Sequence, residues 1–313
     1  MDNNDNNKSA WNEPFYKERN IGKCLSVGVS LISNRFIKIV KLAAPAIAVS
    51  AIILTVVTLA FCNAGFKYEV ADSVIFKVFA TLMGLAAVSL LAAFAFRCVD
   101  VNIEGLNIYS VGLKYTYNKE FWRKALVAFI IGAVALAVMT AILLMANLIL
   151  NFFDDQQAVE QTRNGISIAA IIVFGIALVI AVLLITPLYM AMTTMMIRNN
   201  NLYKDFKDGY MLGWKKWGRI FALDVFINLI VAVMAVFLLS PAYVTSLMMH
   251  SATLSRMQGD AVNIPSYFTA ITVCVLALSS VIFSIIVITR FLPHAYFYAN
   301  VMAEDNDNNE NKK

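Results

Sequence analysis

Side chains that commonly carry out chemistry are sparse in this chain of 313 residues, and they form no recognisable catalytic pattern. Membrane di-iron and copper enzymes need several histidines at helical spacing, but the sequence has only His250 and His294, which follow different apolar stretches. Neither histidine lies in the middle of such a stretch, where an intramembrane serine protease would need one. HExxH, Walker and GxGxxG motifs are missing, and the four cysteines contain no CxxC pair. We therefore expect a non-enzyme with no catalytic residue, no metal site and no cofactor.

A few polar residues within apolar stretches are candidates for a polar core or a cavity. Asp224 and Asn228 are four residues apart and therefore share a helix face, and Asn147 lies late in another apolar stretch. Charged groups at membrane depth are functional candidates. Asp224 is, however, close to Arg219 in the sequence, so pairing or solvation at the interface is the alternative interpretation.

Two prolines are candidate hinges. Pro187 and Pro293 each occur towards the end of an apolar stretch. A proline inside a helix removes a backbone hydrogen bond and favours a kink. Such a kink either forms a gate or bends the helix around its neighbours.

The composition indicates that these residues are positioned by membrane-spanning helices. The chain is 60% hydrophobic and 14% charged, whereas soluble domains are about half apolar and a quarter charged. A helix needs about 20 apolar residues to cross a bilayer, and runs that are apolar on every face do not resemble barrel strands. We predict an all-α integral membrane domain over residues 15–302, with spans at about 42–66, 76–97, 125–153, 166–197, 221–250 and 266–292. The polar tails, residues 1–14 and 303–313, are predicted to be disordered.

The distribution of basic residues predicts the orientation of these spans. Twenty-one Lys and Arg lie on one side and four on the other, so the positive-inside rule places both termini in the cytoplasm. The outward loops are short and carry no N-x-S/T sequon, which is in keeping with a bacterial cytoplasmic membrane. Because the basic residues alternate with apolar runs, we expect no nucleic-acid partner.

The segments on the cytoplasmic side resemble one another. SVGVSLISNRF from Ser26 is similar to SVGLKYTYNKEF from Ser110, and GYMLGWKKWGRIF from Gly209 keeps the aromatic and basic end of the pattern. This similarity predicts three repeats, each with an amphipathic helix followed by a two-span hairpin.

Aromatic and basic residues in these segments suit the headgroup layer of a membrane. Packing of the same helices against the inner mouth of the bundle is the alternative. The candidate interface-anchoring residues are Trp122, Arg123, Trp214, Lys215, Lys216 and Trp217.

The repeated SVGxxxxxN(K/R)xF segments and the proline–tyrosine ends of the fourth and sixth spans (Pro187, Tyr189, Pro293 and Tyr296) resemble a known group. It comprises uncharacterised bacterial six-span proteins similar to the membrane domain attached to some glycerophosphodiester phosphodiesterases. The resemblance covers residues 20–300 and implies a membrane module without the phosphodiesterase domain, for which no soluble stretch is long enough.

The resulting hypothesis is a non-enzymatic scaffold or accessory subunit, with membrane lipid and a protein at the cytoplasmic face as its partners. Patterned helices at that face and the lack of catalytic residues favour it. The alternative is a transporter or flippase for a lipid-like or small apolar substrate, with Asp224, Asn228 and Asn147 lining a cavity. The sequence does not specify an oligomeric state.

Overall fold

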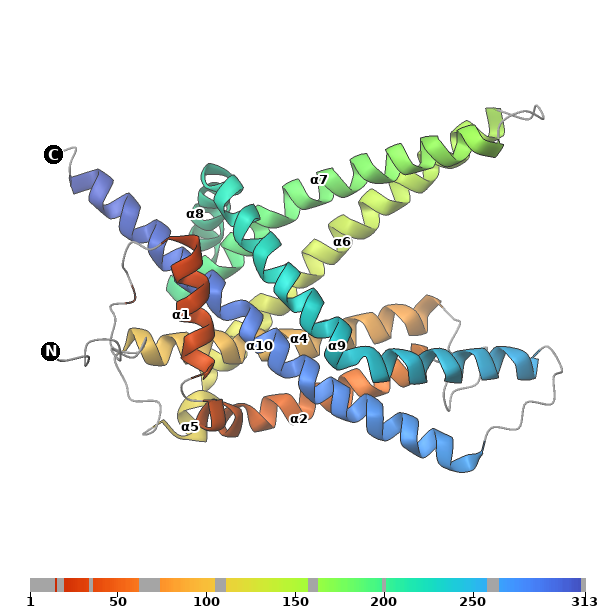
Figure 1. Ribbon diagram of the computed structural model, residues 1–313. Helices are drawn as coiled ribbons and strands as arrows, with labels where there is room; N and C mark the ends of the chain where they lie inside the picture. The colour runs from red at the N-terminus through yellow and green to blue at the C-terminus, as the bar shows by residue number, and fades with distance from the viewer. Residues whose placement is uncertain are drawn as a thin grey trace, which may run out of the picture. The chain divides into compact units, whose positions relative to one another are not determined.

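The computed structural model describes residues 15, 20–33, 36–61, 74–104, 111–156, 163–198, 201–257 and 265–310. All secondary structure in these ranges is helical. In chain order (Figure 1), the helices are α1 (Ile21–Ser33), α2 (Phe36–Phe61), α4 (Val74–Ile103), α5 (Leu113–Thr116), α6 (Lys119–Gln156), α7 (Arg163–Arg198), α8 (Leu202–Lys215), α9 (Trp217–Met257) and α10 (Ser266–Glu310).

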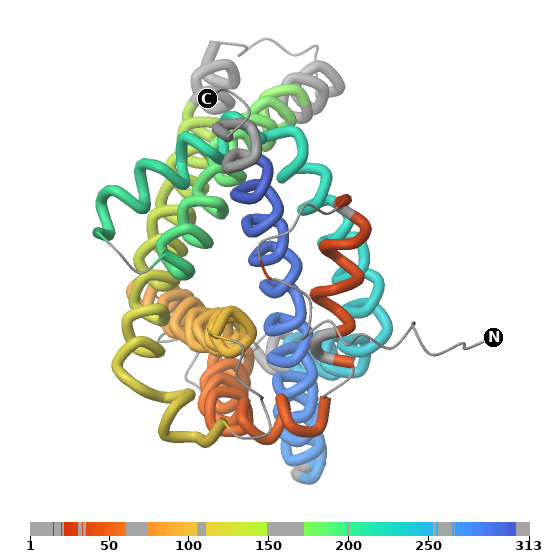
Figure 2. Tube along the Cα trace, turned by 90° about the vertical axis from the view of Figure 1, so that its left-hand side faces the viewer, coloured from red at the N-terminus to blue at the C-terminus, as the bar shows by residue number. Residues whose placement is uncertain are grey.

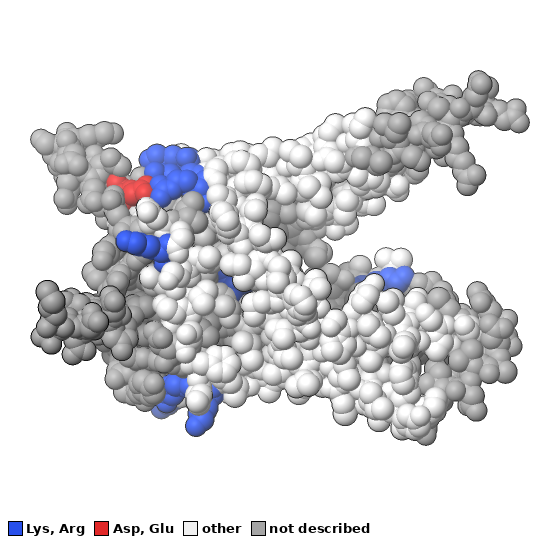
Figure 3. All heavy atoms as spheres, in the orientation of Figure 1, with Lys and Arg blue, Asp and Glu red and all other residues white. Residues whose placement is uncertain are grey.

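Six of these helices are long and apolar enough to cross a membrane, which confirms the predicted class of multi-pass α-helical membrane protein. The spanning segments are Phe36–Ala60, Val74–Ile103, Lys119–Leu148, Ile172–Arg198, Trp217–Ala252 and Tyr267–Glu304. Figure 3 shows Lys and Arg atoms mainly near the ends of the helices, while uncharged residues form most of the visible surface between them.

The helices extend beyond several of the predicted span boundaries. α2 begins before Lys38, and α4 continues past Arg97 to Ile103. The charge-free stretches end earlier because they stop at the first charged residue, although a helix continues through a charge that is paired or solvated. α10 likewise continues to Glu310, into residues 303–313 for which disorder was predicted. Propagation of an existing helix adds a hydrogen bond for each residue fixed. The other tail, residues 1–14, lies outside the described residues.

The chain divides into two compact units within the region predicted as one membrane domain. The first comprises residues 1–129 and 222–313, and the second comprises residues 130–221. In the first unit α2, α4 and α10 pack against one another. α1 packs against α10, and Figure 2 shows it alongside that helix. The most buried segments are residues 91–99 of α4 and 291–301 of α10.

Tyr296 joins three segments of the first unit. The amide of Asn102 on α4 donates to the Tyr296 hydroxyl at 2.7 Å. The Cys24 thiol on α1 lies 3.9 Å from the Tyr296 carbonyl oxygen, and the Phe15 ring lies 5.4 Å from the Tyr296 ring. The tyrosine on which part of the family resemblance rests is therefore a packing centre.

The second unit contains most of α6 and all of α7 and α8. α8 packs against the last turns of α7. Asn201 begins α8, and its side-chain oxygen accepts a hydrogen bond from the backbone N–H of Tyr203. This is the usual role of Asn at a helix N-terminus.

A tyrosine hydroxyl is inserted into the hydrogen-bond ladder of α2 next to Pro45. The Tyr117 hydroxyl donates to the carbonyl oxygen of Leu42 at 2.9 Å and accepts from the N–H of Ala46 at 3.2 Å. These two backbone groups are the pair that an α-helix joins directly. Insertion of a side chain at such a point is a recognised cause of helix bending.

Replacing Tyr117 with phenylalanine is expected to cost about 1–3 kcal/mol in unfolding free energy, because it leaves two part-buried backbone groups without this bridge. Burial raises the pKa of Tyr117 to about 12 from 10.0. The folded state thus favours the neutral phenol, whose contribution is complete below pH 10 and is lost as the pH rises towards 12. Thermal midpoints in detergent between pH 8 and 12 test this. A variant with wild-type stability and an unchanged alkaline slope would contradict the bridging role.

Candidate functional site

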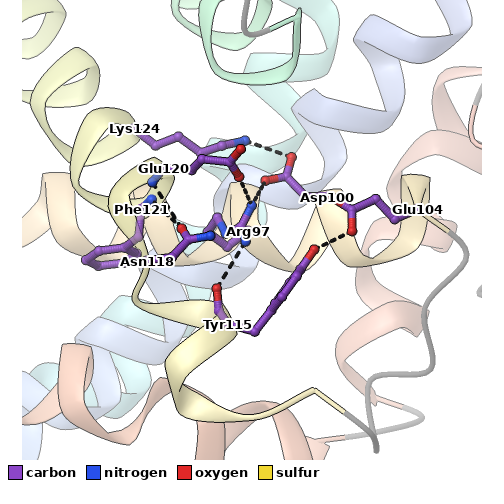
Figure 4. Close-up of polar contacts among 8 residues, drawn as sticks. All are labelled: Arg97, Asp100, Glu104, Tyr115, Asn118, Glu120, Phe121 and Lys124. Atoms are coloured by element: carbon purple, nitrogen blue, oxygen red, sulfur yellow. Dashed lines mark hydrogen bonds and ion pairs between the residues drawn. The ribbon is translucent and has the colours of Figure 1, made fainter.

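A network of charged residues joins the end of α4 to the start of α6 (Figure 4). The Arg97 guanidinium donates through Nη1 to Asp100 Oδ2 and to Glu120 Oε2, both at 2.7 Å. Lys124 Nζ donates to the other oxygen of Asp100, also at 2.7 Å. The Asp100 carboxylate therefore lies between two cations.

Both cations of this network are buried. The side chains of Arg97 and Lys124 are 2% and 3% exposed, whereas Asp100 is 13% and Glu120 is 46% exposed. Arg97, Lys124, Asp100 and Glu120 carry two positive and two negative charges, so the group has no formal excess to attract an ion. The opposite charges offset the cost of removing the cations from water.

The short helix α5 is held by the same arginine. Arg97 Nη2 donates to the Tyr115 carbonyl oxygen at 3.1 Å, and its guanidinium lies 4.8 Å from the Tyr115 ring centre. The Tyr115 hydroxyl donates to Glu104, and burial, followed by that hydrogen bond, raises the pKa of Tyr115 to about 12. Arg97 thus fixes the connection between α4 and α6 at several points.

Asn118 begins α6 as an N-terminal cap. Its side-chain oxygen accepts from the N–H of Glu120 at 3.0 Å and of Phe121 at 3.2 Å. The cap satisfies donors that a helix leaves without an internal partner, and Phe121 is fully buried. The Asn and Phe positions of the SVGxxxxxN(K/R)xF pattern therefore have a structural role here. Asn34, the matching residue near α1, lies outside the described residues.

Asp224 and His294 form a second polar contact in the first unit. His294 Nε2 on α10 lies 3.2 Å from Asp224 Oδ1 on α9, with the histidine side chain 4% exposed and the aspartate 17% exposed. Asp224 therefore lies close to His294, and its pairing or solvation near Arg219 stays a prediction. The sequence alone does not show this contact, because it does not reveal that the first turns of α9 approach α10 at His294.

The other two polar-core candidates do not join Asp224. Asn228 is exposed on α9, and Asn147 is exposed on α6 in the second unit. Neither lines a described pocket. Within the described ranges, no group of three or more His, Cys, Asp or Glu side chains is arranged to hold a metal ion.

The two candidate hinge prolines are buried beneath glycines. A Cβ added at Gly213 of α8 would lie 2.7 Å from Pro187 Cα, and one at Gly28 of α1 would lie 2.9 Å from the Pro293 nitrogen. α7 and α10 continue as helices through these prolines. Each proline thus lies where a short helix approaches a spanning helix closely.

The candidate anchoring residues differ in exposure. Trp122 and Trp214 are 60% and 45% exposed. Trp217 is half-buried, and its ring stacks on Phe221 at 5.1 Å. The basic candidates range from exposed Lys215 to half-buried Arg123 and Lys216.

Each unit contains a pocket of ligand size. One, of about 340 Å³, lies between α6 and α7 and has apolar walls that include Ala141 and Ala177. The other, of about 470 Å³, lies between α2, α9 and α10 and has hydroxyl groups in its walls. Searches with the sequence and structure find no matching family model, curated protein or solved structure.

Proposed function

We propose that the protein is a non-enzymatic membrane scaffold or accessory subunit that uses α8 to bind a protein partner. The observation that carries this proposal is the two-sided character of α8. Gly209 and Gly213 are buried against α7, whereas Tyr203, Met211 and Trp214 are exposed. Lys204, Lys207 and Lys215 are exposed as well.

The exposed surface formed by Tyr203, Lys204, Lys207, Met211, Trp214 and Lys215 is called the α8 face. Tyr, Trp and Met are enriched at the centre of protein interfaces. The lysines complement an acidic surface and guide its approach. The same residue types suit the headgroup layer, so membrane lipid is the second partner that we propose for this face.

Further features support the proposed repeats. Gly28 of α1 meets Pro293, and Gly213 of α8 meets Pro187. Each short helix thus contacts an even-numbered span near a proline. In the middle copy, a Cβ at Gly112 would meet nothing within 4 Å, and Arg97 holds α5 instead. We further propose a bacterial cytoplasmic membrane with both termini inside, on the basis of the Lys and Arg asymmetry.

The transporter or flippase alternative receives less support. Asn147 and Asn228 are exposed on apolar helices and line none of the described pockets. Close contacts at Pro187 and Pro293 favour fixed packing over a gate.

Replacing Tyr203, Met211 and Trp214 together with serine is expected to abolish binding of a stoichiometric protein partner without unfolding the protein, because all three side chains are exposed. Truncation of interface anchors costs at least about 2 kcal/mol each where they are central. Affinity purification in mild detergent, with mass spectrometry of proteins and lipids, measures the result.

The matched control replaces Met248 and Phe237 of α9 and Tyr267 of α10 with serine. These side chains are similarly exposed and line no described pocket. The proposal requires that the partner is retained by this control. A protein that purifies with a single lipid or small molecule and no protein partner would contradict the scaffold function and favour transport.

A further inference from the structure

We propose that the pocket between α2, α9 and α10 is a binding site for one acyl chain and the adjoining ester group of a glycerolipid. The pocket measures about 470 Å³ and includes Leu54, Leu276 and Phe283 in its walls. This volume is within the range of about 300–1,000 Å³ for small-molecule sites. The site is independent of the α8 face and lies within the first unit.

The walls of the pocket determine the class of ligand that reaches it. All three helices are membrane-spanning by length and composition, so the medium around them is lipid. Thr58 is three residues before the end of α2, about 5 Å along the helix axis. Leu54 is about 10 Å from that end. On the α2 side, the pocket therefore extends from near the end of that span into the hydrocarbon region.

Hydroxyl groups distinguish this pocket from the apolar one between α6 and α7. Tyr243, Ser246 and Ser279 line it, and within the described part of the chain their hydroxyls have no protein hydrogen-bond partner. A hydroxyl in an apolar medium costs free energy unless it forms a hydrogen bond. The ester carbonyls of a glycerolipid are acceptors, and they lie next to the acyl chains that would fill the apolar part.

The shape of α9 contributes to the pocket. Pro241 lies inside α9 between the lining residues Leu239 and Ala242, and α9 bends along its length (Figure 1). Proline removes the backbone hydrogen bond to the carbonyl four residues earlier. That carbonyl, of Phe237, accepts a hydrogen bond from the Ser240 hydroxyl at 3.2 Å instead. Because a side-chain hydroxyl donates in place of the missing backbone N–H, the backbone hydrogen bonds of α9 are interrupted beside the pocket.

The test uses the full chain in nanodiscs of phosphatidylethanolamine and phosphatidylglycerol. A phosphatidylethanolamine analogue with a diazirine halfway along one acyl chain is photolysed, and the labelled peptides are identified by mass spectrometry. We expect labels concentrated in residues 239–246 and 276–283. Ser246→Leu fills the pocket and should reduce this labelling about tenfold. Ser279→Ala removes one donor and should reduce it about threefold.

Ser251→Leu is the matched control, because Ser251 is on the same helix and exposed but does not line the pocket. It should leave labelling of both peptides unchanged. Labels spread evenly over the exposed sides of α6, α7 and α9, with no effect of Ser246→Leu or Ser279→Ala, would show surrounding bulk lipid only and overturn the proposal. Ser279→Ala keeps the test decisive if Ser246→Leu fails to fold.

Discussion

Replacing Asp100 with asparagine is expected to lower the free energy of unfolding by about 3–5 kcal/mol, the range for breaking a buried ion pair. The Asp100 carboxylate accepts from Arg97 and from Lys124 at 2.7 Å each. Asparagine keeps the shape but loses the charge, so Lys124 is left buried at 3% exposure with no anion from this residue. Loss of intrinsic tryptophan signal during heating in detergent measures the change.

The matched control is Asp208→Asn in the second unit. Asp208 accepts from Arg198 at 3.2 Å, but the two side chains are 42% and 30% exposed. Pairs exposed to solvent contribute about 0–1 kcal/mol. Equal losses for Asp100→Asn and Asp208→Asn would show that burial of the network is not what makes it stabilising.

A double replacement separates the loss of the pair from the buried charge left behind. Adding Lys124→Met to Asp100→Asn removes the buried cation that Asp100 had contacted and replaces it with an apolar chain of similar length. Part of the stability should return, because exchanging both partners of a buried pair for apolar groups is often close to neutral. An additive loss in the double-mutant cycle would instead mean that Asp100 and Lys124 are not coupled.

The six spans were predictable because their signal lies in composition. A run of about 20 apolar residues has one stable arrangement in a bilayer, which is a helix. The ends of the helices were less predictable. From the sequence, Arg97 and Lys124 are expected to lie in water at the cytoplasmic side, where they indicate the orientation of the spans. Both are buried in the structure, and their contacts with Asp100 offset part of the free-energy cost of that burial.

The polar contacts between helices depend on which spans are neighbours, and a single sequence does not reveal which spans lie next to each other. Asp224 and His294 are on different spans, so their pairing follows from the packing of α9 and α10. The interruption of the backbone hydrogen bonds in α2 is partly predictable, because Pro45 lies inside that helix and has no N–H to donate. The sequence does not show that the Tyr117 hydroxyl enters there. Gly209 and Gly213 are four residues apart and share one face of α8, but their spacing does not specify the helix that this face contacts.

Replacing Gly213 or Gly209 with alanine is expected to destabilise the second unit by about 1–3 kcal/mol each, the usual cost of overpacking. An alanine Cβ at Gly213 would lie 2.7 Å from Pro187 Cα, and one at Gly209 would lie 2.8 Å from Ala191 Cα. These atoms are backbone, so α8 has to move away from α7. Maleimide labelling of Thr194→Cys, at a buried site beneath Gly209, should rise when α8 moves.

The direction of the change in unfolding free energy separates close contact from helix propensity. Alanine is favoured over glycine inside helices by about 0.5–1 kcal/mol, so Gly175→Ala on α7, where nothing lies within 4 Å of the added Cβ, should stabilise the protein. In the first unit Gly28→Ala and Gly22→Ala on α1 form a second matched pair, because only Gly28 meets Pro293. If all five glycine replacements stabilise equally, close contact with the spanning helices does not hold the short helices. If Gly28→Ala and Gly213→Ala destabilise while Gly22→Ala and Gly175→Ala stabilise, the glycine–proline contact is the common means by which α1 and α8 are fixed to their spanning helices.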